Sequence, residues 1–493
     1  MNYISTRNSS YKVTATQAIS MGLAPDGGLF VPEFIPSVDM EFIRSLAEQP
    51  YWEKATRIMS LYLDEFSREE LSSIAKPSYA DNFDHAAVAP LYYLDDATAV
   101  MELWHGPTSA FKDMALQIMP RLLTASLRKN EEKRTVCILV ATSGDTGKAA
   151  LEGFRDIPGT KIIVFYPQNG VSDVQKLQMC TQKGENVRVV AVEGNFDDAQ
   201  TGVKAIFSDK AFAQKLDEKG YFLSSANSIN WGRLLPQIVY YFSAYCDFAR
   251  SGRIAFGDEI DFAVPTGNFG DILAGWYAKR MGLPVRRLLC ASNANRVLTD
   301  FMETGRYNKQ RDFYLTDSPS MDILVSSNLE RLLFNLTGDS EQTASYMSAL
   351  SKDGVYCVSE ELLAAVQSEF TAGSATDAEG KTEIAKFMTA KKYLVDTHTA
   401  VALCALDAYR KKMGAEIPTV VLSTASAFKF CGAVLSALGM EKEESGLAML
   451  KSLAECTGYT APGPLAALEG AELRFRDAVR PDDMARAVEE FLK

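Results

Sequence analysis

The feature that most constrains the fold of this chain is a series of short, nearly continuous apolar runs rich in β-branched residues. Strands covered by helices on both faces have this pattern, whereas strands with one solvated face alternate polar and apolar residues. Amphipathic stretches follow most of the runs, for example GKAALEGFRD after residue 146. The alternation predicts parallel βαβ units and an α/β fold. The runs cover residues 135–142, 161–167, 186–192, 261–267, 286–292 and 419–426.

The length of the chain favours more than one domain, because 493 residues are too many for a single compact core. We expect an N-terminal supporting region with helical content, then a smaller and a larger α/β domain, over residues 1–95, 96–230 and 231–493. The polar segment 370–385 indicates a surface excursion between helices. Ligands of parallel sheets bind at the C-terminal ends of the strands, so the strand-to-helix turns are the candidate sites.

Composition excludes several classes of protein. A net charge of −12 argues against a nucleic-acid-binding surface. The chain lacks an apolar run of about 18 residues, so we expect no membrane span, and its first residues lack the apolar core of a signal peptide. The eight scattered cysteines form no CxxC pair and are typical of buried free thiols. With only three histidines a metal site is not expected. These features favour a cytoplasmic enzyme.

The turn TGNFGD, residues 266–271, follows a predicted strand and begins a predicted helix. Glycines three residues apart let the backbone curl so that successive N–H groups and the helix N-terminus face one anion. A phosphate site and a simple tight turn both explain the pattern. The similar EGNFDD, residues 193–198, places Asp197 and Asp198 where an anion would bind and is interpreted as structural.

A second turn, TSGDTGKAA at residues 142–150, resembles a P-loop but fails its pattern, because Thr142 and Ala149 replace the required glycine and hydroxyl residue. Its hydroxyl and N–H groups are suited to a carboxylate. An ordinary helix cap by Ser143, Asp145 or Thr146 is the alternative.

Two further segments carry polar groups near predicted helices. In SSANSINWGRLLPQ, residues 224–237, Asn230 and Arg233 lie near a helix start, and an arginine there can bind phosphate or carboxylate in a bidentate manner. The hydroxyls of STASAFKF, residues 423–430, either face a site or cap a helix. His398 is expected at a helix start capped by Asp396 or Thr397, and no histidine is assigned a catalytic role.

One lysine stands out once these segments are taken together. Lys112 lies in HGPTSAFKDMALQ, just before an apolar helical run. The segments HGPTSAFKD, ATSGDTG, SANSIN, PTGNFGD and STASAFKF occur in the order found in threonine synthases, and the chain resembles the longer branch of that family, found in enterobacteria and fungi. The N-terminal GLAPDGGLFVPEFIP and the later DTHTAVAL extend the resemblance over nearly the whole chain.

The resemblance implies the fold-type II architecture of pyridoxal-phosphate enzymes, as in the tryptophan synthase β subunit, with two open α/β domains around a cofactor cleft. It implies that Lys112 binds pyridoxal 5′-phosphate covalently and then acts as a proton shuttle. Thr424 would face the pyridine nitrogen, and Asp145 the ring hydroxyl. The cofactor phosphate would bind Gly267, Asn268, Phe269, Gly270 and Asp271, the substrate carboxylate Ser143, Gly144 and Thr146, and the substrate phosphate Asn230 and Arg233.

The activity implied is that of a carbon–oxygen lyase acting on phosphates, which converts O-phospho-L-homoserine and water to L-threonine and phosphate. The resemblance leaves open a phospholyase or a serine/threonine dehydratase of the same fold, a catalytically inactive binding protein, and a monomer or homodimer. A nucleotide-binding enzyme is disfavoured by the failed P-loop and the lack of GxGxxG.

Overall fold

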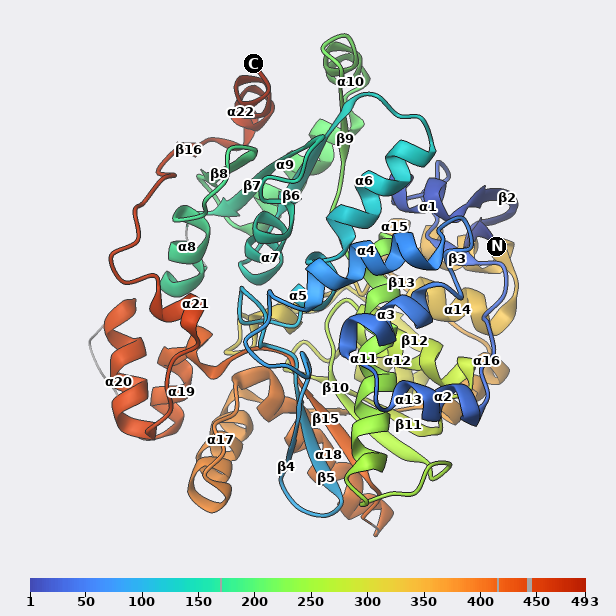
Figure 1. Cartoon of the computed structure of the whole chain (residues 1–493), viewed down its shortest axis with the longest axis vertical. Helices are drawn as coiled ribbons and strands as arrows, with labels where there is room; N and C mark the ends of the chain where they lie inside the picture. The colour runs from blue at the N-terminus through green and yellow to red at the C-terminus, as the bar shows by residue number, and fades with distance from the viewer. Residues whose placement is uncertain (169–170, 415, 441–445) are drawn as a thin grey trace.

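The computed structural model contains two parallel sheets, and it describes residues 1–168, 171–414, 416–440 and 446–493. The smaller sheet lies at the top of Figure 1 beside the C-terminus, and the larger sheet lies below it. The long helix α11 and the N-terminal helices lie beside the larger sheet (Figure 1). The α/β fold predicted from the apolar runs is confirmed, because each of the runs forms a strand.

The larger sheet has the order β14-β11-β10-β15-β5-β4 and is parallel except for β4, which pairs antiparallel with β5. Its central strands are buried along their whole length, which explains their continuous apolar character. The strands are β4 (Leu91–Tyr93), β5 (Thr98–Glu102), β10 (Ile260–Pro265), β11 (Val285–Ser292), β14 (Phe370–Ser374) and β15 (Thr419–Ser423). The helices that follow its strands or pack on them include α11 (Trp231–Arg250), α12 (Gly270–Met281), α13 (Val297–Thr304), α16 (Glu360–Glu369), α17 (Asp377–Lys391), α18 (Thr397–Met413) and α19 (Cys431–Ala437).

The smaller sheet is parallel throughout and has the order β16-β8-β7-β6-β9. Alternate residues of β6 enter different apolar clusters: Val136 and Ile138 belong to the large central core, and Cys137 and Leu139 to a separate core beneath α9 and α22. The strands are β6 (Thr135–Ala141), β7 (Thr160–Pro167), β8 (Val187–Val192), β9 (Tyr221–Ser224) and β16 (Ala478–Val479). The helices are α6 (Met119–Lys129), α7 (Asp145–Phe154), α8 (Asp173–Cys180), α9 (Phe196–Ser208), α10 (Lys210–Asp217) and α22 (Met484–Phe491).

The N-terminal region has the expected helices and also a small antiparallel sheet of order β2-β1-β3. Tyr3 of β1 packs against Trp231 at the start of α11, with 5.5 Å between the ring centroids. The region therefore shares the core of the larger unit. Its elements are β1 (Asn2–Ser5), β2 (Asn8–Thr14), β3 (Phe30–Pro32), α1 (Ala15–Met21), α2 (Met40–Leu46), α3 (Tyr51–Met59) and α4 (Arg68–Tyr79).

The remaining elements lie in the connections and near the C-terminus. A two-stranded antiparallel sheet, β12 (Arg306–Asn308) with β13 (Val355–Cys357), joins the large central core through Tyr307 and Tyr356. The short helix α5 (Asp113–Leu116) follows Lys112. The others are α14 (Leu329–Thr337), α15 (Ser340–Lys352), α20 (Leu447–Thr457) and α21 (Gly463–Ala466), with the 3-10 helices η1 (Pro319–Met321), η2 (Ala427–Lys429) and η3 (Pro481–Asp483).

Sheet membership departs from the expected boundaries at two places. β5, expected in the smaller domain, pairs with β15 of the larger sheet, and β16 with α22 returns from the C-terminus to the smaller sheet. Such exchanges are invisible to local sequence patterns, because strand partners are chosen by tertiary packing. The division into three domains itself stays a prediction.

The interpretation of residues 370–385 as a surface excursion is wrong. Residues 370–374 form β14, the edge strand paired with β11, and α17 begins at Asp377. Phe370 is buried, but the other residues of the strand are partly exposed, because an edge strand is covered less completely.

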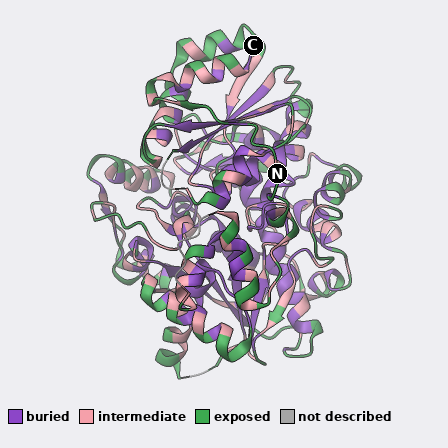
Figure 2. Cartoon of the chain, turned by 90° about the vertical axis from the view of Figure 1, so that its left-hand side faces the viewer, coloured by how far each residue is buried: buried purple, intermediate pink, exposed green. Residues whose placement is uncertain are grey.

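Burial follows the two sheets: Figure 2 shows buried strands inside both halves of the molecule and exposed residues on the outer helices. All eight cysteines are free, as predicted. The expectation that they are buried is wrong for Cys357 and Cys456, which are exposed, and for Cys404, which is only partly buried. Within the described residues, no helix combines the length and apolar character needed to cross a bilayer.

Candidate active site

Lys112 lies at the point where the chain passes from β5 of the larger sheet to α5. The backbone N–H of Phe111 donates to the carbonyl of Thr424, and a β-bridge joins Ala110 to Ala425. Thr424 directly follows β15, so both residues lie at the C-terminal edge of the larger sheet, where ligands of such sheets bind. The Thr424 side chain is buried, and its hydroxyl makes no hydrogen bond with any described residue.

The Lys112 amine has no hydrogen-bond acceptor among the described residues, and it lies over the Phe111 ring, 4.0 Å from the centroid. Burial, reinforced by the charge of Arg233, lowers the pKa of this amine to about 8, although Asp145 and Asp271 act in the opposite direction. A usable fraction of Lys112 is therefore neutral and nucleophilic near neutral pH.

The SGDT turn connects β6 to α7, and its helix cap is not one of the residues we expected. The Thr142 hydroxyl accepts from the N–H groups of Gly144 and Gly147, at 3.0 and 2.9 Å. The side chains of Ser143 and Thr146 make no hydrogen bond with any described residue and are partly exposed. The alternative of a cap by Ser143, Asp145 or Thr146 is therefore wrong, and two hydroxyls remain available to a ligand.

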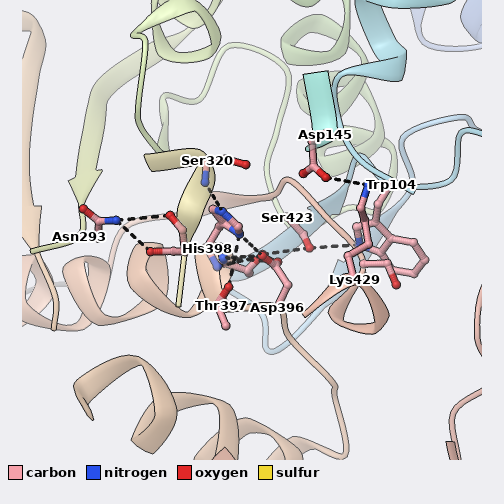
Figure 3. Close-up of polar contacts among 12 residues, drawn as sticks. Trp104, Asp145, Asn293, Ser320, Asp396, Thr397, His398, Ser423 and Lys429 are labelled. Carbon is pink, nitrogen blue, oxygen red and sulfur yellow. Dashed lines mark hydrogen bonds and ion pairs between the residues drawn. The ribbon is translucent and has the colours of Figure 1, made fainter. Parts of the chain in front are cut away.

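Asp145, the first residue of α7, binds two groups. Its Oδ1 lies 2.7 Å from Nζ of Lys429 and accepts from Nε2 of Gln175 at 2.8 Å. Burial raises the pKa of the Asp145 carboxyl, but Lys429 and Gln175 outweigh burial, so the pKa ends below its ordinary value. Figure 3 shows the Asp145 carboxylate pointing at the Lys429 amine. Lys429 is thus a site residue that sequence reasoning missed, although it lies in the STASAFKF motif.

The GNFGD turn begins α12, and a second loop holds its carbonyls. Ser326 Oγ donates to the carbonyl of Gly267 at 2.8 Å, and Asn328 Nδ2 donates to that of Asn268 at 3.0 Å. Phe269 has a left-handed backbone, with φ of 63°, just before the helix starts at Gly270. With the carbonyls bound on one side, the N–H groups at the helix start are free to bind an anion.

Close packing explains the first glycine of this turn. A Cβ at Gly267 would lie 2.6 Å from the carbonyl oxygen of Ser320. The N–H of Ser320 in turn donates to Nε2 of His398, whose Nδ1 pairs with Asp396 at 2.9 Å (Figure 3). The predicted cap of His398 by Asp396 is confirmed, since Asp396 accepts from the His398 N–H. The histidine supports the segment that packs against the turn.

Asp271, the last residue of the GNFGD turn, points into the protein. Its Oδ1 accepts from the hydroxyls of Tyr240 at 2.5 Å and Tyr241 at 2.9 Å, and its Oδ2 is buried without a partner in the described part of the chain. Burial raises the pKa of the Asp271 carboxyl to about 6. A carboxylate held in this way repels phosphate, so only the backbone of Asp271 is suited to binding one.

Asn230 and Arg233 differ in whether their side-chain polar atoms remain available to a ligand. Asn230 caps α11 by accepting from Gly232 and donates to the carbonyl of Ile19, which argues against a direct contact with a substrate phosphate. Arg233 is buried, donates to the carbonyl of Ala226 and has an Nε that no described residue contacts as a hydrogen-bond partner. Burial lowers its pKa to about 10, so the guanidinium stays charged at neutral pH.

These residues fit pyridoxal phosphate on the basis of their free groups. The Lys112 amine, of low pKa, lies within the electrostatic influence of Arg233, a buried guanidinium without a carboxylate partner among the described residues, and of Asp145 in the SGDT turn of the smaller sheet. A buried charge lacking a counter-ion is costly, so this arrangement implies an anionic ligand.

Fold and site together define the class: a pyridoxal-phosphate-dependent enzyme of fold type II. The family profile described as pyridoxal-phosphate dependent enzyme matches residues 97–425, and profiles for the threonine synthase N-terminus and C-terminal region match residues 2–79 and 399–490. The chain belongs to the threonine synthase family, as its motifs predicted.

Individual relatives agree with this assignment. The chain is 42% identical to threonine synthase of Pseudomonas aeruginosa over 88% of this chain and 90% of that protein. It is 40% identical to human threonine synthase-like 1 over 89% of this chain, and it spans only 61% of that longer relative. The crystal structure of PLP-bound threonine synthase from Brucella melitensis superimposes with a TM-score of 0.88 at 38% identity, covering 100% of this chain and 98% of that one.

Proposed function

We propose that the protein converts O-phospho-L-homoserine and water to L-threonine and inorganic phosphate, with pyridoxal 5′-phosphate bound at Lys112. The observation that carries the proposal is that the Lys112 amine, which has no hydrogen-bond acceptor among the described residues, lies within the electrostatic influence of Arg233, a buried guanidinium with no carboxylate partner among them. The reaction needs such a pair, because a proton must be moved at carbon while an anionic substrate is held in place.

The cofactor, when bound, supplies an electron sink that stabilises negative charge on the substrate carbons. We assign Lys112 Nζ the proton transfers at the α- and β-carbons, since burial lowers the pKa of this amine to about 8. The backbone N–H groups of residues 267–271 would bind the cofactor phosphate, and the Thr424 hydroxyl would face the ring nitrogen. We assign Asp145 to the ring hydroxyl.

For the substrate, we assign Ser143, Gly144 and Thr146 to the carboxylate, because the two hydroxyls have no other partner among the described residues. We assign Arg233 to the substrate phosphate, because its Nε has no partner among the residues that the structure describes. We do not retain Asn230 as a direct ligand, because both polar atoms of its side chain are engaged. A cytoplasmic location and a monomer or homodimer remain predictions, and the free cysteines are consistent with a reducing compartment.

The test is to incubate the purified protein with O-phospho-L-homoserine and to assay phosphate and threonine together. Equal amounts of both support the proposal. Phosphate with a keto acid and ammonia indicates a phospholyase on this scaffold, and the same products from serine or threonine, without phosphate, indicate a dehydratase. If the protein shows the visible absorbance of bound cofactor but forms no product, the proposed cofactor is supported and the proposed substrate is wrong. Absence of that absorbance favours an inactive binding protein.

A further inference from the structure

Lys429 is a buried lysine that the proposed chemistry does not use. It ends η2, a few residues after Thr424, and its side chain has no exposed surface. Its ammonium lies 2.7 Å from Asp145 Oδ1 and donates to the carbonyl of Thr108 at 2.9 Å. One buried cation therefore joins the segment that follows β15, the SGDT turn and the segment that leads to Lys112.

The contact at Thr108 continues toward Lys112. The N–H and hydroxyl of Thr108 donate to the two carboxylate oxygens of Asp113, at 2.8 and 2.9 Å, and Asp113 directly follows Lys112. The Thr108 carbonyl also accepts from Gln178 Nε2, at the longer distance of 3.3 Å, so displacing Lys429 would remove the shorter of these two supports of the segment. The backbone around Lys112 thus depends on a residue that does not touch it.

Charge provides a second link between Lys429 and Lys112. The charged groups that act on the Lys112 amine are Arg233 from α11, Asp145 from α7, Asp271 from α12, and Lys429. Lys429 and Asp145 have opposite effects on it and are paired with each other. Because both partners are buried, removing one leaves the other uncompensated beside Lys112, whereas removing both keeps the balance.

We propose that Lys429 is a positioning residue that, through its ion pair with Asp145, balances the charge beside the Lys112 amine and holds the loops of the site together. This proposal rests on the role proposed for Lys112. It differs from a purely structural ion pair, because a structural pair affects stability without changing the titration of Lys112.

The experiment measures how readily Lys112 reacts as a function of pH. Full-length protein freed of cofactor is methylated with trace formaldehyde and a hydride donor between about pH 6 and 10, a range that spans the titration of a perturbed lysine. Peptide mass spectrometry then gives the extent of methylation at Lys112, with exposed lysines of the same digest as internal standards. No turnover is needed, so the result is independent of which product the enzyme makes.

We expect Lys429→Met to raise the midpoint of Lys112 reactivity by about one pH unit, and Asp145→Asn to lower it by a similar amount. Lys429→Arg retains the charge and should leave the midpoint within a few tenths of a unit of the wild type. The double variant Asp145→Asn/Lys429→Met should return close to the wild-type value. This variant also serves if Lys429→Met alone fails to fold, because it leaves no unpaired buried charge.

Lys148→Met is the matched control. Lys148 is also buried and pairs with a carboxylate, Glu152, on the same helix as Asp145, but it contacts Gln182 instead of the loops of the site. The Lys148→Met substitution should lower thermal stability without changing the pH midpoint of Lys112 reactivity.

Two results overturn the proposal. One is a folded Lys429→Met variant whose Lys112 midpoint is unchanged. The other is a folded double variant whose Lys112 midpoint differs from that of the wild type by a full pH unit. If the midpoints shift as expected but the wild type makes no threonine, the proposed function fails and the role of Lys429 stands.

Discussion

The N–H of Phe111 donates a hydrogen bond to the carbonyl oxygen of Thr424, with 2.8 Å between nitrogen and oxygen. This main-chain bond joins the residue before Lys112 to the residue that follows β15. Because it involves no side chain, it holds the backbone before Lys112 against the end of β15 whatever the neighbouring side chains are. A lysine and a threonine that are far apart in the sequence thereby become parts of one site.

Lys112→Ala should abolish both turnover and the visible absorbance of bound pyridoxal phosphate. The substitution removes the only group proposed to bind the cofactor covalently, and general acid–base catalysis by such a group is worth about 10²–10⁴-fold in rate even without the covalent bond. Absorbance spectra and the coupled threonine assay provide the measurement. The exposed Lys210→Ala is the control and should retain both properties. Full activity in Lys112→Ala would overturn the assignment.

Arg233→Ala should weaken the binding of O-phospho-L-homoserine about 10- to 100-fold, the range expected when a hydrogen bond to a charged group is lost. Affinity for the cofactor should change far less. Substrate titration at saturating cofactor and cofactor titration without substrate separate the two effects. Arg233→Lys keeps the charge and should be intermediate. Equal loss of both affinities would show that Arg233 serves the cofactor.

Asp271→Asn should change how stability depends on pH. Burial raises the pKa of the folded Asp271 carboxyl to about 6 from an ordinary 3.8. The charged form is therefore disfavoured in the folded state, and the wild type loses stability from this group as pH rises from about 4 to 6. Two pKa units correspond to about 3 kcal/mol. Asparagine still accepts from both tyrosines, so the variant should gain stability relative to the wild type over this interval.

Urea denaturation of wild type and Asp271→Asn at matched pH values between about 3.5 and 7 measures this difference. Taking the difference cancels the titration of groups common to both proteins. A constant difference across the interval would mean that Asp271 titrates normally in the folded protein.

Gly153→Ala should destabilise the protein by about 1–3 kcal/mol, the usual cost of overpacking. A Cβ at Gly153 of α7 would lie 1.9 Å from the carbonyl oxygen of Leu116 in α5, the short helix that follows Lys112. Gly380→Ala is the matched control, because a Cβ there meets nothing within 4 Å inside α17. That change should stabilise the protein by about 0.5–1 kcal/mol through helix propensity. Thermal melts of both variants provide the test. A lower melting temperature in Gly380→Ala as well as in Gly153→Ala would refute the packing argument.

The local pattern of the sequence predicted what depends on near neighbours. The strands at residues 135–141, 160–167 and 285–292 are evident in the sequence because both of their faces are covered and the chain is apolar along most of their length. β9 and β14 were missed, because a short strand or an edge strand is only partly covered and its sequence carries a weaker signal. The glycine spacing pointed to the GNFGD turn as a candidate anion site, and the resemblance to threonine synthases, carried by short motifs, singled out Lys112 and assigned that turn to the cofactor phosphate.

Tertiary structure alone decided the contacts between distant segments. Motifs gave Asp145 and the STASAFKF segment separately, but no local rule pairs Asp145 with Lys429, and only the arrangement of the two sheets brings them within 2.7 Å. The same holds for β5, which joins the larger sheet, and for Asn230, whose amide is used by the fold. The sequence by itself determined the fold class and the family, because both are expressed in periodicity and short motifs. Which polar groups remain free for a ligand was decided by packing, because a hydrogen bond depends on where both partners lie in space.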